Sequence, residues 1–480
     1  MEAERHLAAM LSVEDVRAAL GDELLDERPG VMAGFVGVAN DSRVATPGEL
    51  FVALRTPDPL TPPEEVRDGH DYIGGAIARG VAGLVVSRPV EAPEGVAVFR
   101  VRETKHAIGE LARYWRRHFY LAKAIVVTGN VGKTTTKELV AAVLASKYEV
   151  LKSPANFNDE IGLSMTLFGL TDRHQRIVLE AGMFELGEIR RLCEIAQPEI
   201  AVVLNVGPTH LQRLGSLEAI AAAKAEAVES LPWRGTAILN ADDPYVAAME
   251  GKTKARVLTF GLAPGVTVRA ADVRSRGLGG VDFNLSCGGR GVAVHSALPG
   301  AALVSNALAA ATVAIADGMS VEEAGHALSS ASVPARLEAK LAPGGATVLD
   351  DTYNASPASM LAALSVLAET AGRRLALLGD MLELGSAEAE GHRLVGERAA
   401  ALVDALYTIG PRGEQIAAAA REAGAREVRH FASKEEAGRV LRQLLGPGDI
   451  LLVKASHGLA LHGVVAELMK ERPLPRARNP

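Results

Sequence analysis

Two glycines, a lysine and a threonine stand close together in the segment "TGNVGKTTT" (128–136), directly after the apolar run "AIVV". Glycines let backbone N–H groups turn inward around phosphate oxygens, where a Cβ would obstruct them. Lys133 can place a positive charge on the β- and γ-phosphates, and the Thr134 hydroxyl can ligate Mg²⁺. The pattern predicts a phosphate-binding loop, although the usual spacing G-x-x-x-x-G-K-[ST] would need glycine where Val127 stands.

The predicted loop provides most of the expected nucleotide contacts. A helix expected over roughly residues 133–147 points the positive end of its dipole at the anion. An ordinary glycine turn is the alternative, and it is disfavoured because the G-K-T triplet, a strand and a helix coincide. The N-K-x-D sequence with which guanine-nucleotide proteins read their base does not occur, so we expect ATP. The residues expected to bind it here are Thr128, Gly129, Asn130, Val131, Gly132, Lys133, Thr134 and Thr135.

Two further polar residues follow strands of the predicted sheet. Glu180 ends "RIVLE", and His210 follows "VVLNVGPTH". Ligands and metals collect at the carboxyl ends of strands in an open parallel sheet, so this pair could hold a second Mg²⁺. Spacing alone favours a plainer interpretation, in which Glu180 is a solvated turn residue and His210 caps a helix.

Lys224 lies on a helix expected to begin near Ser216, where a single lysine usually faces solvent. The stretch "ILNADDP" (238–244) predicts a strand followed by a turn. Its Asn240 and Asp243 could read an adenine amino group, or could simply close the turn. The sequence pattern alone does not decide between these roles.

The chain as a whole predicts an α/β scaffold for these residues. Short β-branched runs alternate with alanine-rich helical stretches, which is typical of βαβ units. We expect three domains in the 480 residues, and place them at 1–102, 103–333 and 334–480. The glycine-rich stretch between residues 261 and 300 is expected to form a β-hairpin appended to the second domain.

Composition disfavours several other classes of protein. The formal net charge is −7, and no basic stripe interleaved with aromatic residues occurs, so nucleic-acid binding is not expected. Two cysteines outside any C-x-x-C spacing argue against a disulfide framework and fit a reducing compartment. The longest weakly polar run, 302–316, is too short to cross a bilayer, and the N-terminus lacks a signal peptide's apolar stretch. We expect a cytoplasmic monomer without a membrane span.

Eight segments occur in the order found in the Mur ligases, a family that this chain resembles over nearly its whole length. The segments are "TGNVGKTTTKE", "NFNDEIGLSMTL", "EAGMFELGEI", "NVGPTHLQRLGS", "AAAKAEA", "NADDP", "ARLE" and "LDDTYNASPASMLAAL". The shortened loop T-G-x-x-G-K-T is normal in that family. The resemblance implies an N-terminal UDP-sugar-binding domain, a central ATPase domain with its phosphate loop on a parallel sheet, and a Rossmann-like C-terminal domain.

The resemblance also implies a reaction. ATP would phosphorylate the terminal carboxylate of a UDP-N-acetylmuramoyl-tripeptide, and the amine of D-alanyl-D-alanine would attack the acyl phosphate, in peptidoglycan precursor synthesis. The segment "LGDMLELG" (378–385) and His392 point to this pair of substrates within the family.

Site roles are carried over from the family residue by residue. The residues implied in catalysis are Lys133, His210 and a carbamylated Lys224. The implied ligands of Mg²⁺ are Thr134, Glu180, His210 and Lys224. Asn240 and Asn306 would face adenine, while Arg336 and Asp351 would reach the γ-phosphate and the ribose. Ser42 and Arg43 fall in the UDP-binding segment, and Asn158 in the substrate loop.

The chain departs from the family pattern at Ala302, Ala335, Asp159 and His457. One rival hypothesis is a folylpolyglutamate-synthase-like ligase with another acceptor; the segments 41–54 and 68–86 argue against it, because such enzymes begin with the ATP domain. The other rival is a degenerate nucleotide-binding sensor, which the missing histidine at position 302 motivates. The intact set of Lys133, Glu180, His210 and Lys224 opposes that hypothesis.

Overall fold

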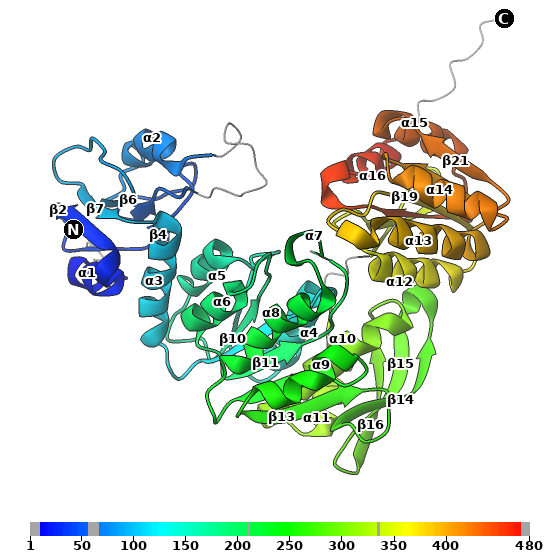
Figure 1. The fold of residues 1–480 in the computed structure, drawn as a ribbon, viewed down its shortest axis with the longest axis horizontal. Helices are drawn as coiled ribbons and strands as arrows, with labels where there is room; N and C mark the ends of the chain where they lie inside the picture. The colour runs from blue at the N-terminus through cyan, green and yellow to red at the C-terminus, as the bar shows by residue number, and fades with distance from the viewer. Residues whose placement is uncertain (1–9, 56–66, 210, 334–336, 472–480) are drawn as a thin grey trace, which may run out of the picture. The chain divides into compact units, whose positions relative to one another are not determined.

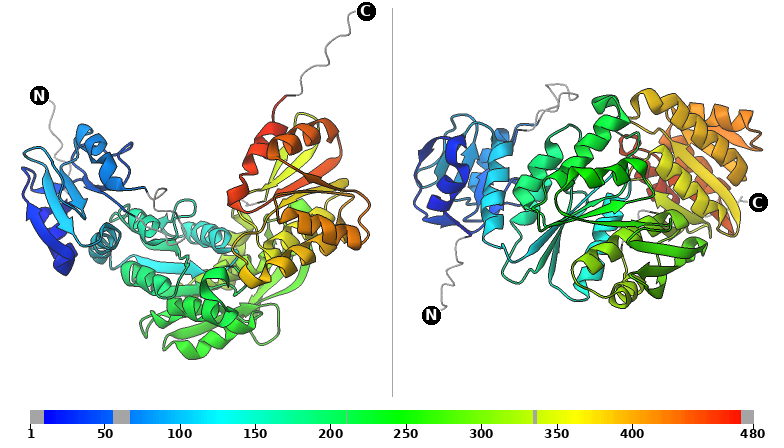
Figure 2. Two further views of the ribbon diagram at one scale, coloured as in Figure 1. Left: turned by 45° about the horizontal axis from the view of Figure 1, so that its top comes forward. Right: turned by 60° about the horizontal axis from the view of Figure 1, so that its bottom comes forward.

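The computed structural model describes residues 10–55, 67–209, 211–333 and 337–471. The chain divides into two compact units. One comprises Met1–Val126, Lys147–Met183 and Gly187–Ile200, and the other Val127–Ser146, Phe184–Leu186 and Ala201–Pro480. Strands and helices alternate through both, and helices pack against the sheets (Figures 1 and 2). The predicted α/β fold class is confirmed.

The N-terminal part of the chain forms a five-stranded sheet, parallel except for β2. Its order is β2 (Leu24–Arg28), β7 (Ala97–Val101), β6 (Gly83–Val86), β5 (Leu50–Val52) and β4 (Val38–Ala39). Strands β1 (Leu11–Ser12) and β3 (Gly34–Phe35) form a separate antiparallel pair, and the helices are α1 (Val13–Leu20), α2 (Ile73–Ala78) and α3 (Thr104–Arg117). Ser12 and Asp15 form a capping box that starts α1. Apolar residues of α1 and α3 pack with Phe35 and Phe99 in one core.

A nine-stranded sheet carries the phosphate loop. Its order is β16 (Arg290–Ser296), β15 (Val281–Cys287), β14 (Val268–Ser275), β13 (Arg256–Gly261), β12 (Thr236–Asn240), β11 (Ile200–Val203), β8 (Lys123–Thr128), β10 (Arg176–Glu180) and β9 (Val150–Lys152). The helices of this part are α4 (Lys133–Ala145), α5 (Glu160–Leu167), α6 (Glu188–Ala196), α7 (Leu211–Leu214), α8 (Leu217–Glu229), α9 (Pro244–Ala247), α10 (Val304–Ala316) and α11 (Val321–Ser330). Strands β10 and β11 are buried at every position, as continuous apolar runs predict.

The predicted hairpin between residues 261 and 300 is only partly right. β15 and β16 do form an antiparallel pair, but β14 pairs in parallel with β13 and therefore continues the central sheet. The alternating pattern of the sequence indicates a half-buried strand without indicating which neighbour it pairs with.

The C-terminal part forms a six-stranded sheet in which only β17 is antiparallel. Its order is β17 (Glu338–Leu341), β18 (Thr347–Asp351), β22 (Asp449–Lys454), β19 (Arg373–Gly379), β20 (Ala405–Ile409) and β21 (Val428–Phe431). Helices α12 (Pro357–Ala368), α13 (Glu388–Leu402) and α14 (Gly413–Glu422) share one hydrophobic core, and α15 (Lys434–Leu444) and α16 (His462–Leu468) share another. Helices on both faces of a mostly parallel sheet give the predicted Rossmann-like arrangement.

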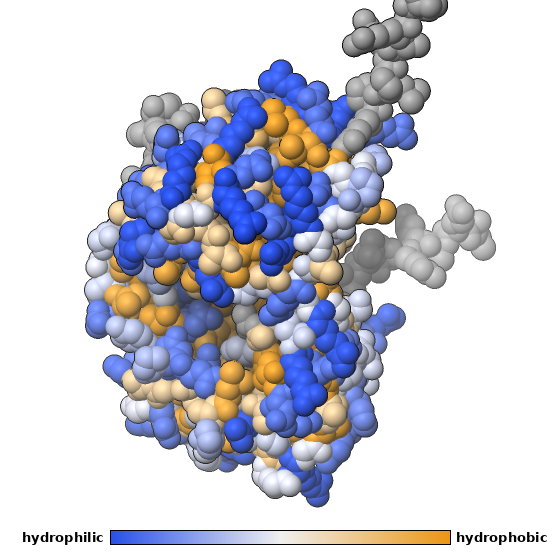
Figure 3. Space-filling model, turned by 90° about the vertical axis from the view of Figure 1, so that its right-hand side faces the viewer, coloured by the Kyte–Doolittle hydropathy of each residue, from blue (hydrophilic) through white to orange (hydrophobic). Residues whose placement is uncertain are grey.

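Hydrophilic and hydrophobic residues are interspersed over the face drawn in Figure 3. Within the described ranges, no helix combines the length and the apolar character that spanning a bilayer requires.

Candidate functional site

The phosphate loop connects the end of β8 at Thr128 to the start of α4 at Lys133. Gly132 caps α4 with a φ of +90°, a conformation that side chains with a Cβ rarely adopt. A Cβ at this position would also lie 2.4 Å from the Nδ2 atom of Asn306. The conformation therefore favours glycine at position 132, and a Cβ there would require the Asn306 side chain to move. The strand, loop and helix lie where the sequence predicted them.

Asn205, directly beyond β11, holds the apex of this loop. Its Oδ1 accepts hydrogen bonds from the backbone N–H groups of Asn130 (3.0 Å) and Val131 (2.9 Å), and its Nδ2 donates to the carbonyl of Val131 (2.8 Å). Asn130 donates in turn from its own Nδ2 to the carbonyl of Gly207 (2.9 Å). Asn205 was not predicted from the sequence. Its only signal was an amide residue placed just after a buried strand, in "LNVG".

Two lysines of the site influence each other. Lys133 Nζ donates to the carbonyl oxygens of Gly129 (2.9 Å) and Asn130 (3.4 Å), so its side chain bends over its own loop. Lys224 on α8 is buried, and the loss of hydration lowers its pKa well below the ordinary value; the positive charge of Lys133 lowers it further. The interpretation of Lys224 as a solvent-facing residue is therefore wrong. α8 begins where predicted, with Ser216 as its N-cap.

Asn306 lies against the phosphate loop. From α10 its Nδ2 donates to the carbonyl of Gly132 (3.1 Å) and to Oγ1 of Thr136 (2.7 Å). The side chain thus supports the first turn of α4 from the side. Contact with adenine, which the family resemblance implies, stays a prediction.

The turn after β12 is closed by its own polar side chains. Asn240 Nδ2 donates to the carbonyl of Leu204 (2.8 Å). Asp243 Oδ1 accepts from the N–H groups of Tyr245 (3.0 Å) and Val246 (3.1 Å), capping α9, and its Oδ2 accepts from another backbone N–H, that of residue 206 (2.8 Å). Of the two interpretations, the structure supports turn closure for Asp243, while an adenine contact of Asn240 stays a prediction.

Glu180 ends β10 with its side chain buried, so the interpretation of a solvated turn residue is wrong. Asn158 Nδ2 donates to Glu180 Oε1 (2.9 Å), and the Asn158 carbonyl accepts from the N–H of Gly182 (2.8 Å). The predicted metal ligand and the predicted substrate-loop residue are thus brought together. Asp159, one of the departures from the family pattern, caps α5 by accepting from the N–H of Gly162 (2.8 Å).

Arg43 and Ser42 lie in a turn before β5 in the N-terminal sheet. Arg43 Nε lies 2.9 Å from Oδ1 of Asp41, and Arg43 Nη2 lies 2.7 Å from Oδ2. These bonds, with that from the Arg43 backbone N–H, lower the pKa of Asp41 to about 2. The guanidinium is largely exposed, and the Oγ of Ser42 faces Gly75 of α2. Their role in binding UDP stays a prediction.

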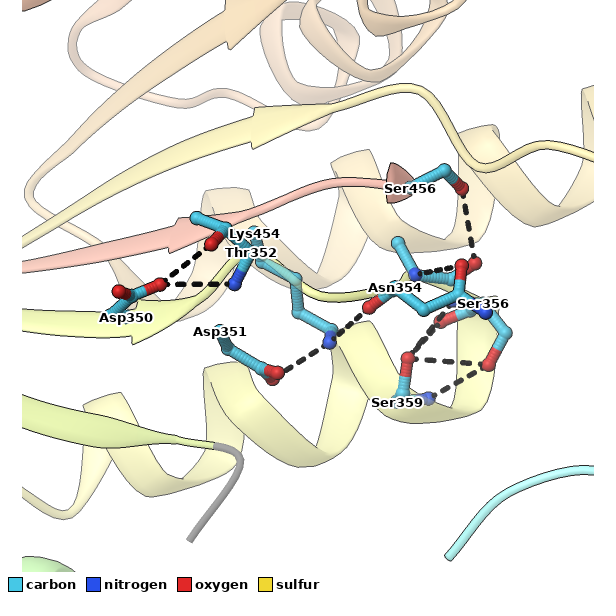
Figure 4. Close-up of polar contacts among 9 residues, drawn as sticks. Asp350, Asp351, Thr352, Asn354, Ser356, Ser359, Lys454 and Ser456 are labelled. Atoms are coloured by element: carbon cyan, nitrogen blue, oxygen red, sulfur yellow. Dashed lines mark hydrogen bonds and ion pairs between the residues drawn. The ribbon is translucent and has the colours of Figure 1, made fainter. Parts of the chain in front are cut away.

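In the C-terminal sheet, Asp351 forms a buried ion pair with Lys454, Oδ2 to Nζ, at 2.7 Å (Figure 4). The segment 378–385 begins at the end of β19 and continues into the loop that follows it. The buried His392 holds this loop: its Nε2 accepts from the N–H of Met381 (3.0 Å), while its Nδ1 lies 2.7 Å from the carbonyl of Glu388. His392 therefore stabilises this segment from within the fold. His457, another departure, faces the ring of Tyr353 at 6.1 Å between centroids.

Two predicted site residues, His210 and Arg336, lie outside the described residues. In the part of the chain that the structure describes, no three His, Cys, Asp or Glu side chains gather as a metal-binding group. The predicted Mg²⁺ ligands that are described include a buried carboxylate, Glu180, and a buried amine, Lys224. A carboxylate is an oxygen donor that suits this hard cation, and the amine suits it only after conversion to a carbamate.

Comparison with known proteins shows the family to which this chain belongs. A family described as "Mur ligase middle domain" matches residues 127–314, and one described as "Mur ligase, glutamate ligase domain" matches residues 335–457. The UDP-N-acetylmuramoyl-tripeptide–D-alanyl-D-alanine ligase of a Synechocystis species is 38% identical over 446 residues, covering 91% of this chain and 92% of that protein.

Solved structures of such ligases are similar over nearly their full length. A crystal structure of MurF from Acinetobacter baumannii gives a TM-score of 0.84 at 29% identity, covering 96% of this chain and 98% of that chain. MurF ligase from Thermotoga maritima, solved in complex with ADP, gives a TM-score of 0.78 at 27% identity, covering 91% and 97%. This chain belongs to the Mur ligase family. It is an ATP-dependent ligase that forms amide bonds, and its similarity is to the members that add D-alanyl-D-alanine.

Proposed function

We propose that this chain joins D-alanyl-D-alanine to a UDP-N-acetylmuramoyl-tripeptide at the expense of ATP, as a step of peptidoglycan precursor synthesis. The activity for which its relatives are named supports this substrate pair. The observation in the structure that carries the proposal is a complete phosphate loop beside a second lysine, Lys224, whose amine is buried and has a lowered pKa.

The proposed chemistry has two steps. A carboxylate is a poor electrophile, so the terminal carboxylate of the tripeptide first attacks the γ-phosphorus of ATP, and ADP leaves. The amine of D-alanyl-D-alanine then attacks the acyl carbon, the C–O bond to phosphate breaks, the amine loses a proton, and inorganic phosphate leaves with one carboxylate oxygen. The protein contributes mainly by positioning the reactants and neutralising charge.

The phosphate loop is assigned the first of these tasks. Asn205 holds two N–H groups at the loop apex, and the N–H groups at the start of α4 are assigned to the phosphate because a helix N-terminus attracts anions. Lys133 exchanges its bonds to loop carbonyls for the β- and γ-phosphates when the nucleotide binds. Thr128, Gly129, Gly132 and Thr135 shape and line this loop.

Magnesium would be held by Thr134, Glu180, His210 and Lys224, and would neutralise charge on the transferring phosphate. Lys224 fits this role once its neutral amine adds to CO₂ and loses a proton, because the carbamate is an anionic oxygen donor whereas an ammonium group would repel the metal. The lowered pKa of Lys224 favours the neutral amine that this reaction needs.

The remaining assignments follow the family pattern. Ser42, Arg43 and Asn158 bind the UDP-linked substrate, Asn240 and Asn306 the adenine, and Arg336 and Asp351 the γ-phosphate and ribose. The three domains are proposed at 1–102, 103–333 and 334–480, in a cytoplasmic monomer.

The test is to incubate the purified chain with ATP, Mg²⁺, D-alanyl-D-alanine and UDP-N-acetylmuramoyl-tripeptides that end in meso-diaminopimelate or L-lysine. We expect phosphate release together with a UDP-linked pentapeptide. ATP binding without any ligated product would contradict the proposal and favour the sensor hypothesis. Ligation of glutamate to a folate in place of this reaction would favour the folylpolyglutamate-type alternative.

A further inference from the structure

Polar contacts join the carboxyl ends of three strands of the C-terminal sheet, and Figure 4 draws those between β18 and β22. Asp351 and Lys454 are register partners at the last positions of β18 and β22. Lys454 Nζ lies 2.7 Å from Asp351 Oδ2 and donates to the carbonyl of Asn354 at 2.8 Å. The Oγ of Ser456 accepts from the N–H of Leu382, which follows β19, at 2.9 Å.

This edge of the sheet has the topology of a ligand site. The chain leaves β18 and β19 toward α12 and α13, which share one hydrophobic core, but leaves β22 toward α16, which belongs to the other. Adjacent strands whose following segments diverge to opposite faces open a crevice at their carboxyl ends, where open α/β sheets bind ligands. Lys454 ends β22, the strand that lies between β18 and β19.

A neighbouring pair of residues shows what is unusual about Lys454. Asp350 also pairs with a lysine, Lys340, at 2.7 Å, but the Lys340 side chain is 32% exposed whereas that of Lys454 is 3% exposed. A lysine is rarely buried so fully unless its charge is paired. Lys340 touches the Asp350 carboxylate and an exposed glutamate, while Lys454 bonds both the Asp351 carboxylate and the carbonyl of the turn that follows it. Its ammonium group therefore restrains the carboxylate and the turn together.

We propose that Lys454 is a positioning residue, which holds the Asp351 carboxylate in the orientation that accepts hydrogen bonds from the ribose hydroxyls of ATP. The inference rests on the proposed function, which assigns Asp351 to the ribose. A carboxylate can rotate about its side-chain bonds, and a hydrogen bond weakens steeply when its angle is poor. Fixing one oxygen on Lys454 fixes the direction in which the group faces the nucleotide.

The consequence is that Lys454 contributes to the preference for a ribonucleotide without touching it. A hydrogen bond from a ribose hydroxyl to a charged carboxylate stabilises the bound nucleotide. Removing that hydroxyl should therefore lower kcat/KM for the nucleotide about tenfold or more. Without Lys454 the Asp351 carboxylate is misdirected, so removing a ribose hydroxyl should lower kcat/KM by a smaller factor. A merely structural lysine would lower activity with ATP and with deoxy-ATP alike.

The experiment measures ligation by the full-length enzyme with ATP, 2′-deoxy-ATP and 3′-deoxy-ATP, and takes the ratio of kcat/KM between ATP and each analogue. The variants are Lys454→Met, Lys454→Gln, which keeps an N–H donor without the charge and remains available if the first variant does not fold, and Asp351→Asn. Lys340→Met is the matched control, because it removes the lysine of the neighbouring pair.

We expect a ratio of about ten or more for the unaltered enzyme and for Lys340→Met, and a ratio near one for Lys454→Met and Asp351→Asn, with Lys454→Gln between them. The change should arise mainly in the KM for ATP. An unaltered ratio in both Lys454 variants, with a collapsed ratio in Asp351→Asn, would overturn the role of Lys454 and leave the ribose assignment standing. An unaltered ratio in Asp351→Asn would overturn both, and a collapse in Lys340→Met would show that any loss of stability suffices. Failure of the unaltered enzyme to ligate would instead contradict the proposed function.

Discussion

The phosphate loop and the carboxyl ends of β18 and β22 (the β18–β22 edge) both bind one nucleotide in the proposed function, but different features hold them in place. The loop depends on its local backbone conformation, in which Gly132 adopts a positive φ, and the side chain of Asn205 accepts from the N–H groups of residues 130 and 131. The edge takes its shape from side chains, through an ion pair between residues 103 positions apart in sequence.

This difference predicts how each region fails. A side chain that reaches from a backbone-built loop can be removed without loss of the loop's shape, so its loss should appear in turnover. A buried ion pair between side chains fixes the arrangement of the groups around it. Its loss should therefore appear in stability and in nucleotide preference. Substitutions in the two regions can therefore be told apart by what they change.

The largest effect is expected from Lys133→Ala. The lysine charge acts most strongly on the transferring phosphoryl group, so turnover should fall about a hundred- to a thousandfold while the melting temperature stays nearly unchanged. Steady-state ligation kinetics and thermal unfolding measure the two quantities. Lys147→Ala, an exposed lysine just past the end of the same helix, is the control and should behave as the unaltered enzyme. Near-normal turnover in Lys133→Ala would remove this lysine from the mechanism.

A somewhat smaller loss is expected from Lys224→Ala. The variant should bind ATP but ligate about a hundredfold more slowly, the scale of losing a partner in a metal site. Added acetate should restore part of the activity, because a small carboxylate can occupy the space of the lost carbamate. Full activity without acetate would show that the buried Lys224 has only a structural role.

The two lysine–aspartate pairs at the C-terminal sheet should differ in stability. Lys454→Met leaves Asp351 buried without its cation and should lower the free energy of unfolding by about 3–5 kcal/mol. Lys340→Met opens a partly exposed pair and should cost less than about 1 kcal/mol. Urea unfolding of the full chain measures both, and equal losses would contradict the distinction between the pairs.

The smallest effect is expected from Asn205→Ala, which removes the side chain that holds the loop apex. The Asn205 side chain makes three hydrogen bonds worth about 1 kcal/mol each, and we expect about half of this loss to appear in nucleotide binding, as an about tenfold rise in the KM for ATP with little change in kcat. Asn284→Ala, whose Nδ2 bonds an exposed aspartate on the β14–β15 pair, is the matched control. A loss confined to kcat would show that Asn205 acts on the reacting groups and not on the loop.

The features of the site that are local in sequence could be predicted, and those that depend on distant residues could not. Gly132, Lys133 and Thr134 were predictable because a strand, a glycine turn and a helix start are local in sequence. The burial of Lys224 and Glu180 was not, since spacing alone favoured solvated positions for both; only the family resemblance assigned them to the site. Asn205 and Lys454 were missed altogether, because their partners lie 74 and 103 positions away and no local pattern marks the pairing. The fold class followed from the alternation of strands and helices, whereas the parallel pairing of β14 did not.

The measurement that tests the central claim most directly follows one oxygen atom. The terminal carboxylate of the UDP-N-acetylmuramoyl-tripeptide is labelled with ¹⁸O, and the inorganic phosphate released during ligation to D-alanyl-D-alanine is analysed by mass spectrometry. If the carboxylate is phosphorylated and the acyl phosphate is then opened by the amine, each released phosphate carries one oxygen from the labelled carboxylate. Phosphate free of label, alongside normal formation of the pentapeptide, would contradict the acyl-phosphate account.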